Sequence, residues 1–262
     1  MGTGESISVI LPSFREGARL IEAVRAARCA LGDVQVIVSA HDESDDVKQA
    51  VRAEGAIWVD APRACRGEQL QRGAACAEGQ VLVFLHADTR LPVDASRPIR
   101  QALSVAGVSG GAFRLRFDRS HVVFSTLTAM SGLRLTTSFL GDQGMFCTRR
   151  AYDAAGGFRS MPLFEDVDLA RRLARTGRLV RLEQYVVTSA RRFSKHGPLR
   201  QVTRNAVLML AYHLGVAPAQ LARAYEAPEL PDASPDRKSH RSGPRRIART
   251  HSRIRRRAGR RA

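Results

Sequence analysis

The sequence predicts an α/β fold: a Rossmann-like mixed sheet with helices on both faces, followed by a helical C-terminal extension. Two observations carry this prediction. Strand-like and helix-like segments alternate over about the first hundred residues, and the strand-like segments are apolar on both faces, which is typical of buried parallel strands. The clearest is 81–85 (VLVFL), which is followed abruptly by His86, Ala87 and Asp88.

Each element of the first half follows from a local pattern. Short apolar runs bounded by turn residues predict strands, and apolar residues at helical spacing, such as Leu20, Ile21, Val24 and Ala27, predict helices. The strands are expected at 7–11, 34–38, 57–59 and 81–85, and the helices at 18–31, 47–54 and 69–77. This order favours a parallel half sheet.

The second half is less regular. Alternation over 110–117 indicates a half-exposed strand, and Gly177 follows a good helical pattern. Further strands are expected at 145–147, 179–182 and 186–188, and helices at 98–106, 121–139, 149–155, 165–176, 198–214 and 218–225.

Composition suits a globular domain with a basic tail. The 262 residues are 44% hydrophobic, enough for one large core, and carry a net charge of +17. Residues 232–262 hold 12 Lys/Arg against 2 Asp, whereas the rest of the chain is only +7. Because the tail has few apolar residues, we expect 1–226 to form the folded domain and 227–262 to be disordered.

Cysteine usage and hydropathy favour a cytoplasmic protein. The four cysteines are scattered without a CxxC pair, which indicates reduced thiols. The N-terminus lacks a basic-then-apolar signal segment, and no apolar stretch approaches the roughly 18 residues of a spanning helix. We therefore expect a cytoplasmic location, with peripheral association at the inner face of the membrane as an option.

Polar clusters stand at the ends of the predicted elements. They include 12–16 (PSFRE), 42–46 (DESDD), Arg66 with Gln69, 86–88 (HAD), 141–144 (GDQG) and 164–169 (FEDVDL). Ligands of open α/β sheets bind beyond the carboxyl ends of strands, so Asp88 is a candidate ligand of a divalent cation. Two structural alternatives remain open: Asp88 caps its turn, and the acids of 165–168 only complement the dipole of their helix.

Five motifs in this order resemble those of family 2 glycosyltransferases with the GT-A fold. The chain is most similar to the small bacterial branch of radical-SAM/selenodomain-associated transferases, over about residues 7–225. The motifs are 10–16 (ILPSFRE), 84–92 (FLHADTRLP), 141–144 (GDQG), 165–169 (EDVDL) and 188–193 (TSARRF). The resemblance divides the domain into a donor half (1–92), an acceptor half (93–197) and a helical extension (198–226).

The resemblance implies transfer of a sugar from a nucleoside-diphosphate sugar to an acceptor hydroxyl. In this family, the loop after the first strand contacts the base and ribose, and arginines approach the base or the diphosphate. The implied donor-binding residues are Pro12, Phe14, Glu16, Asp42, Arg66, Gln69, Arg191 and Arg192. Asp142 and Gln143 would line the acceptor side.

The implied mechanism is an inverting, metal-dependent displacement. Asp88 matches the last position of the family's DxD motif and, with His86 at the first, would bind Mg²⁺ or Mn²⁺. Asp166, next to Glu165, matches the general base that accepts the proton of the acceptor hydroxyl. His196 is a further candidate metal ligand, against the alternative of a solvent-facing loop histidine.

The sequence departs from the family pattern at two positions. The second strand commonly ends in Val-Asp, where this chain has Ala40 and His41, so that Asp42 is the nearest substitute for a base-binding acid. His86 replaces the first acid of DxD, and one carboxylate with an imidazole should bind a cation more weakly than two carboxylates.

The acceptor and the tail allow several interpretations. Residues 198–225 suit either an interfacial helix that presents a lipid-linked or carotenoid-like acceptor, or a helix packed on the core. The basic tail suits an anionic membrane surface, non-specific nucleic-acid binding or an extension without a role. Rival functions are a catalytically degenerate nucleotide-sugar binder and a sugar-nucleotide nucleotidyltransferase, although 12–17 lacks the latter's glycine-rich loop. A nucleic-acid partner is not expected, because strand-end carboxylates repel phosphate.

Overall fold

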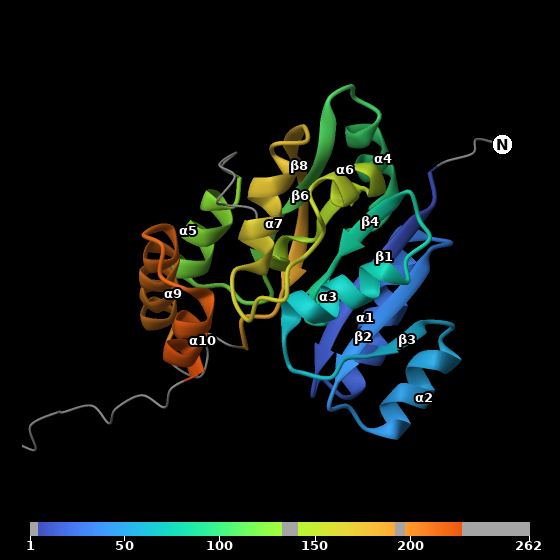
Figure 1. The fold of residues 1–262 in the computed structure, drawn as a ribbon, viewed down its shortest axis with the longest axis horizontal. Coiled ribbons are helices and arrows are strands. Elements are labelled where there is room, and N and C mark those ends of the chain that lie inside the picture. The colour runs from blue at the N-terminus through green and yellow to red at the C-terminus, as the bar shows by residue number, and fades with distance from the viewer. Residues whose placement is uncertain (1–4, 133–140, 192–196, 227–262) are drawn as a thin grey trace, which may run out of the picture. The chain divides into compact units, whose positions relative to one another are not determined.

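The computed structural model describes residues 5–132, 141–191 and 197–226, which are built around an eight-stranded mixed sheet (Figure 1). The strands lie in the order β3-β2-β1-β4-β7-β6-β8-β5. Their bounds are β1 Ile7–Phe14, β2 Gln35–His41, β3 Ile57–Asp60, β4 Val81–Phe84, β5 Thr89–Arg90, β6 Val108–Phe117, β7 Met145–Thr148 and β8 Arg178–Thr188. The predicted fold class is confirmed.

The first four strands form the predicted parallel half. β1 pairs in parallel with β2 and β4, and β2 pairs in parallel with β3. β1 is longer than expected because its ladder with β2 continues as far as the pair Phe14 and His41. The polar segments that follow β1, β2 and β4 therefore meet at one edge of the sheet.

The second half of the sheet is mixed. β7 runs antiparallel to both β4 and β6, while β6 and β8 are parallel. The two strands predicted at 179–182 and 186–188 are one continuous strand, β8, so that prediction was wrong. The polar residues that interrupt the apolar pattern face a neighbouring strand: Glu183 pairs with Arg114 of β6 at 3.0 Å, and Tyr185 lies beneath the Arg114 guanidinium.

The segment with His86 and Asp88 lies beyond β4 and is not part of the strand. β4 ends at Phe84, and the Leu85 N–H still donates to the Ile10 carbonyl at 3.1 Å. The chain then turns, closed by a bond from the Thr89 N–H to the His86 carbonyl, and Thr89 pairs with Thr188 of β8. The cluster thus joins β4 in the parallel half to β5 at the far edge.

Helices cover both faces of the sheet, as predicted. Their bounds are α1 Ala18–Leu31, α2 Asp45–Ala53, α3 Arg66–Ala75, α4 Ser96–Leu103, α5 Val122–Met130, α6 Arg149–Ala154, α7 Glu165–Leu173, α9 Pro198–His213 and α10 Pro218–Glu226. α3 begins three residues before the predicted start, which places Arg66 in its first turn. α5 ends at Met130, before the predicted 139, and residues 133–139 of that prediction lie outside the described residues.

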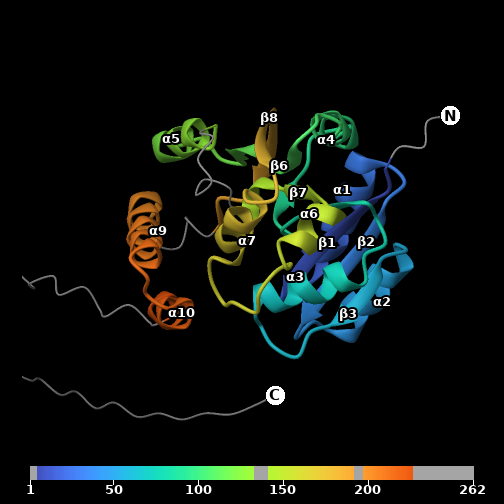
Figure 2. The same cartoon turned by 45° about the horizontal axis from the view of Figure 1, so that its top comes forward.

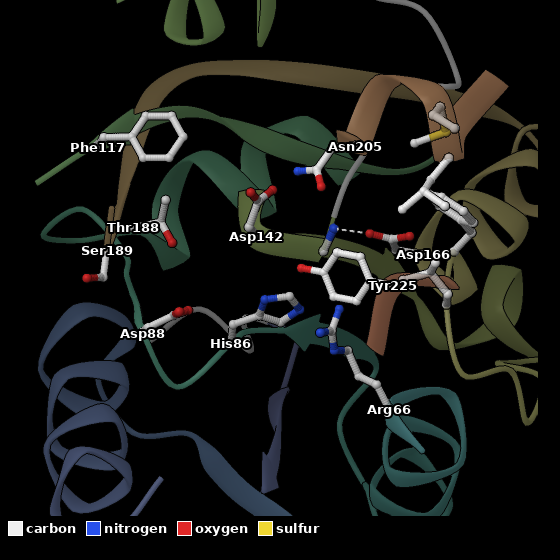
Figure 3. Close-up of a pocket in the computed structure, with 15 residues that line it drawn as sticks. Arg66, His86, Asp88, Phe117, Asp142, Asp166, Thr188, Ser189, Asn205 and Tyr225 are labelled. Atoms are coloured by element: carbon white, nitrogen blue, oxygen red, sulfur yellow. Dashed lines mark hydrogen bonds between the residues drawn. The ribbon is translucent and has the colours of Figure 1, made fainter. Parts of the chain in front are cut away.

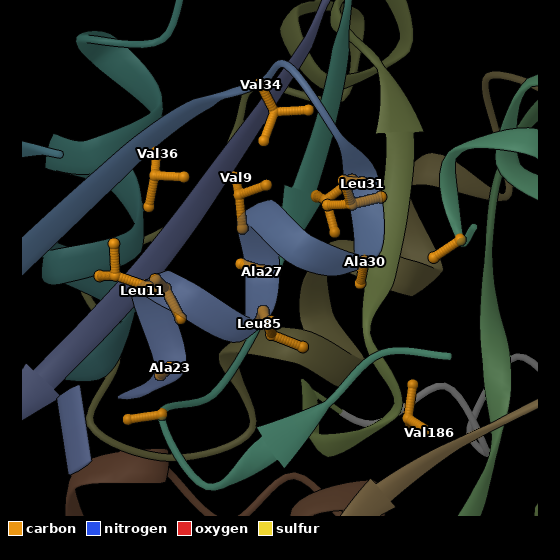
Figure 4. Packing of buried hydrophobic residues seen from close by; sticks show 14 of the residues in the cluster. Val9, Leu11, Ala23, Ala27, Ala30, Leu31, Val34, Val36, Leu85 and Val186 are labelled. Atoms are coloured by element: carbon orange, nitrogen blue, oxygen red, sulfur yellow. The ribbon is translucent and has the colours of Figure 1, made fainter. Parts of the chain in front are cut away.

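Alternation along the strands separates two hydrophobic cores. Val9 and Leu11 of β1 point to one face, where Ala23 and Ala27 of α1 pack (Figure 4). Residues of α2, α4 and α5 belong to the same core. Ile10 points to the other face, together with Leu70 of α3 and Leu169 of α7. Because both faces are covered, the polar groups gather at the strand ends.

The C-terminal extension forms two helices. In Figure 2, α9 lies between α5 and α10, and it contacts both. No helix in the described ranges has the length and apolar character needed to cross a membrane. All four cysteines are free. Arg192, His196 and the predicted tail from residue 227 lie outside the described residues.

Candidate active site

Two adjoining cavities lie at the carboxyl edge of the parallel strands, each of about 210 Å³. They share a wall made of Arg66, His86, Asp88, Leu163 and Tyr225. The first cavity, shown in Figure 3, also receives Asp142 and Asp166. The second is lined by the predicted residues Pro12, Phe14, Glu16 and Gln69. The structure therefore brings together nine of the predicted site residues.

Glu43 organises the loop between β1 and α1. Its Oε1 accepts hydrogen bonds from Ser13 Oγ at 2.7 Å and from the Glu16 N–H at 2.6 Å, and its Oε2 accepts from the Gly17 N–H at 3.0 Å. Gln69 supports the same loop from α3, since its amide donates to the Ser13 carbonyl. Glu43 belongs to the acidic cluster 42–46, but the sequence did not predict a function for it.

An aromatic pair stands beside the second cavity. The rings of Phe14 and His41 stack with centroids 5.8 Å apart, and Phe14 is 44% exposed. The Arg15 guanidinium lies over Phe14 and also pairs with Asp42. Asp42 therefore binds an arginine at the protein surface and lines neither cavity.

The Asp88 carboxylate does not close the turn that follows β4. The turn after β4 is closed by a bond between backbone groups, and no hydrogen bond to the Asp88 carboxylate is found within the described ranges. Figure 3 shows Asp88 and His86 directed into the cavity from the same segment. No cluster of three His, Cys, Asp or Glu residues that could hold a metal occurs in the part of the chain that the structure describes.

An ion pair between a half-buried arginine and a buried carboxylate joins the two halves of the site. Arg66 Nη1 of α3 lies 3.2 Å from Glu165 Oε1 of α7, and Glu165 is only 1% exposed. Desolvation raises the pKa of Glu165, an effect that Arg66 opposes. Desolvation lowers the pKa of Arg66, but the charges of Glu165, Asp166 and Asp88 raise it by more, so the guanidinium stays charged.

Asp166 is held against the Gly141 backbone. The Gly141 N–H donates to Asp166 Oδ2 at 2.5 Å, and the Val167 N–H donates to Oδ1 at 2.7 Å. A Cβ on Gly141 would come within 2.8 Å of His86 Nε2 and 3.3 Å of Asp166 Oδ2, so glycine permits this approach. Desolvation raises the pKa of Asp166, whereas these amides and Arg66 lower it.

A buried arginine supports the Gly141–Gln143 turn. Arg181 of β8 donates to the Phe113 carbonyl at 3.0 Å and to Gln143 Oε1. Burial lowers the pKa of Arg181 to about 10, and the charge of Asp142 opposes this shift. Gln143 is itself buried and lines neither cavity, whereas Asp142 lines the first.

The acids at the start of α7 have specific partners. Glu165 binds Arg66, Asp166 binds Gly141, and Asp168 pairs with Arg172 at 2.6 Å. The residue before them, Phe164, has a left-handed backbone with φ 63°. Its ring stacks on Tyr212 of α9, with centroids 4.8 Å apart. The interactions across the site show that these acids do more than complement the helix dipole.

The C-terminal helices close the first cavity. α9 contributes Asn205, Leu208 and Met209, and α10 contributes Tyr225. None of these was a predicted site residue, and nor were the other lining residues Phe117, Leu163, Phe164, Thr188 and Ser189. The amphipathic pattern of 198–225 was the available signal, but it did not show which face would meet the core.

The remaining predicted donor residue lies at the rim. Arg191 Nη2 is 3.6 Å from Glu16 Oε2, so the segment that follows β8 reaches the loop after β1. Arg191 lines neither cavity.

Solved structures with similar folds include glycosyltransferases. A mannosyltransferase from Pyrobaculum calidifontis, solved with GDP-Man and Mn²⁺, is 18% identical with a TM-score of 0.60, and the match covers 87% of this chain and 66% of that one. Glucosyl-3-phosphoglycerate synthase from Mycobacterium tuberculosis, solved with Mn²⁺ and UDP-glucose, is 21% identical with a TM-score of 0.57, and the match covers 81% and 80%.

A second structure of this synthase contains Mn²⁺, UDP-glucose and glycerol 3-phosphate; it is 22% identical with a TM-score of 0.55, and the match covers 81% of both chains. The chain spans just under two thirds of the mannosyltransferase's length. Neither a protein-family model nor a curated protein sequence matches it. At these identities, the likeness establishes the GT-A fold.

We predict that Glu43→Ala destabilises the loop after β1. The substitution leaves three donors without their acceptor, so the free energy of unfolding should fall by about 1–3 kcal/mol in chemical denaturation. Glu78→Ala, which removes an exposed carboxylate elsewhere, should change it by less than about 0.5 kcal/mol. Equal stability of the two variants would contradict the role given to Glu43.

Proposed function

We propose that the protein is a family 2 glycosyltransferase that moves a sugar from a nucleoside-diphosphate sugar to an acceptor hydroxyl with inversion. The observation that carries this proposal is the shared wall of two cavities, where Arg66, His86 and Asp88 lie between the predicted donor loop and Asp166. The fold shared with nucleotide-sugar glycosyltransferases supports it. The five sequence motifs favour the radical-SAM/selenodomain-associated branch.

The second cavity is the proposed donor site. Pro12, Phe14, Glu16 and Gln69 line it, and the partly exposed Phe14 ring suits contact with a nucleobase. Arg66 at the shared wall would approach the diphosphate. Arg191 lies at the rim, where, with Arg192, it would neutralise the departing nucleoside diphosphate.

His86 and Asp88 fit a divalent cation that the protein and the donor hold together. One carboxylate and one imidazole are too few for a closed protein site, but Mg²⁺ and Mn²⁺ commonly take their remaining ligands from substrate phosphates and water. Both residues stand on the wall between the cavities, where a donor diphosphate would lie. When bound, the cation would supply Lewis-acid stabilisation of the leaving group.

Asp166 is the proposed general base. The bond from the anomeric carbon to the diphosphate oxygen breaks as the bond to the acceptor oxygen forms, and the acceptor's proton passes to the carboxylate. The Gly141 and Val167 amides fix the orientation of Asp166 while leaving it lone pairs for this proton. Glu165, which is buried against Arg66, would hold Arg66 and the adjacent Asp166 in place.

The first cavity favours a neutral, largely apolar acceptor. Phe117, Leu163, Phe164, Leu208 and Met209 supply apolar walls. Among the described lining residues, the carboxylates are Asp88, Asp142 and Asp166, and the arginine, Arg66, is already bound to Glu165. An acceptor phosphate would therefore meet negative charge, whereas the hydroxyl of a lipid-linked or carotenoid-like molecule would not.

Calorimetric titration with UDP-glucose and other sugar nucleotides tests the donor site. We expect binding of one donor in Mn²⁺ that EDTA weakens, and Asp88→Asn should lose most of this metal-dependent part. Asp94→Asn removes the charge of an exposed carboxylate outside both cavities and serves as the control. Binding that is identical with Mn²⁺ and EDTA would reject the metal role, and no binding of any donor would reject the donor site.

Asp166→Asn should lower the transfer rate by about 10²–10⁴ while donor binding persists, because it removes only the proton acceptor. In the wild type, transfer should rise with pH as Asp166 loses its proton, at a pH above the usual range of aspartate because burial raises its pKa. Arg66 lowers that pKa, so Arg66→Gln should move the rise to higher pH.

Arg66→Lys is the control for this pH profile, since it keeps a cation at the same place. The profile at saturating donor separates the pKa effect from weaker binding. The assignment of Asp166 as the base would be overturned by unimpaired turnover of Asp166→Asn. It would also be overturned if Arg66→Gln did not shift the pH dependence of the transfer rate.

Acceptor choice can be measured by product formation from the donor found above. A long-chain neutral alcohol in detergent should accept the sugar, and 3-phosphoglycerate should not. Met209→Lys adds a cation to the cavity wall and should weaken the preference against the phosphorylated acceptor. Efficient transfer to 3-phosphoglycerate by the wild type would contradict an apolar acceptor site.

A further inference from the structure

One face of α9 is apolar and exposed although the helix is firmly packed on its other side. Leu199, Val207, Leu210 and Leu214 are each between 60% and 77% exposed. At about 100° per residue, these four positions fall within an arc of about 80°, so they form one stripe along the helix. The other exposed residue within this arc, Thr203, is uncharged.

The opposite face of α9 is anchored to the domain. Leu208 is buried, and Leu208, Met209 and Asn205 line the first cavity. Tyr212 stacks on Phe164, and Arg204 donates to the Ala224 carbonyl at 3.0 Å, which ties α9 to α10. The stripe therefore has a fixed orientation and points away from the cavity.

The charged residues near the stripe indicate that its partner is anionic. Residues 198–226 contain three arginines, Arg200, Arg204 and Arg223, and a single acid, Glu226. The chain that follows continues with 12 Lys/Arg against 2 Asp over 232–262. A narrow apolar stripe beside basic residues suits a helix that lies in the interface of an anionic bilayer, where basic residues near the surface are attracted to the lipid headgroups. A second copy of the chain would bring equally basic residues to the same surface.

We infer that α9 docks the protein on an anionic membrane, with Leu199, Val207, Leu210 and Leu214 buried in the interface. The basic residues of 232–262 add electrostatic attraction. Because the inner face of the same helix lines the first cavity, docking places that cavity next to the lipid surface. Membrane binding does not depend on sugar transfer, so this inference can be tested even if the proposed function fails.

The test is co-sedimentation of the full chain with vesicles of phosphatidylcholine alone or mixed with phosphatidylglycerol. We expect binding to the mixed vesicles that weakens with salt, because salt screens the basic residues. The variant Val207→Gln/Leu210→Gln keeps all charges but removes apolar side chains from the stripe, and its affinity should fall about tenfold or more. The control Val93→Gln/Val105→Gln changes two exposed valines outside α9 and should bind like the wild type.

Three outcomes would overturn the inference. The wild type fails to bind the mixed vesicles, the α9 variant binds them as well as the control does, or both variants lose binding equally. Sedimentation velocity completes the test: a wild-type dimer that only the α9 variant dissociates would show that the stripe joins two copies of the chain instead. Thermal unfolding of each variant verifies that the fold is retained.

Discussion

The ion pair between Arg66 and Glu165 is the constraint on which the arrangement of the site depends. It links α3, which packs on the parallel strands, to α7, which packs on the mixed half of the sheet. Breaking such a pair leaves a buried charge without a partner, which commonly costs about 3–5 kcal/mol. Close packing reinforces the link, because a Cβ on Gly67 would lie 2.2 Å from the Arg159 carbonyl of the segment that leads into α7.

The same link places acid, imidazole and amide groups around one glycine. With α7 fixed, Asp166 reaches the Gly141 amide, and His86 packs against the same glycine from the segment after β4. Arg181 supports the Gly141–Gln143 turn by donating a hydrogen bond to the Gln143 side chain. Groups from four separate parts of the chain thus converge on Gly141, held there by hydrogen bonds and close packing.

Local pattern was sufficient for the parallel half of the fold. Continuous apolar runs and helical spacing predicted β1 to β4 and their helices, since a buried strand must be apolar on both faces. The pattern failed for β8, which it predicted as two strands. Glu183 and Tyr185 interrupt the apolar run in the sequence, but in the structure they contact Arg114 of the adjacent strand and the strand continues through them.

The sequence by itself determined the fold class and the candidate residues of the donor loop, the His86–Asp88 segment and α7, because motif order and strand ends are properties of the chain. Only the tertiary structure decided that Glu43 holds the loop after β1, that Gln143 lies buried on Arg181, and that α9 and α10 line one cavity. The physical reason is distance along the chain. Glu165 and Arg66 are 99 residues apart, and α9 is amphipathic whichever face it buries, so packing alone selects these contacts.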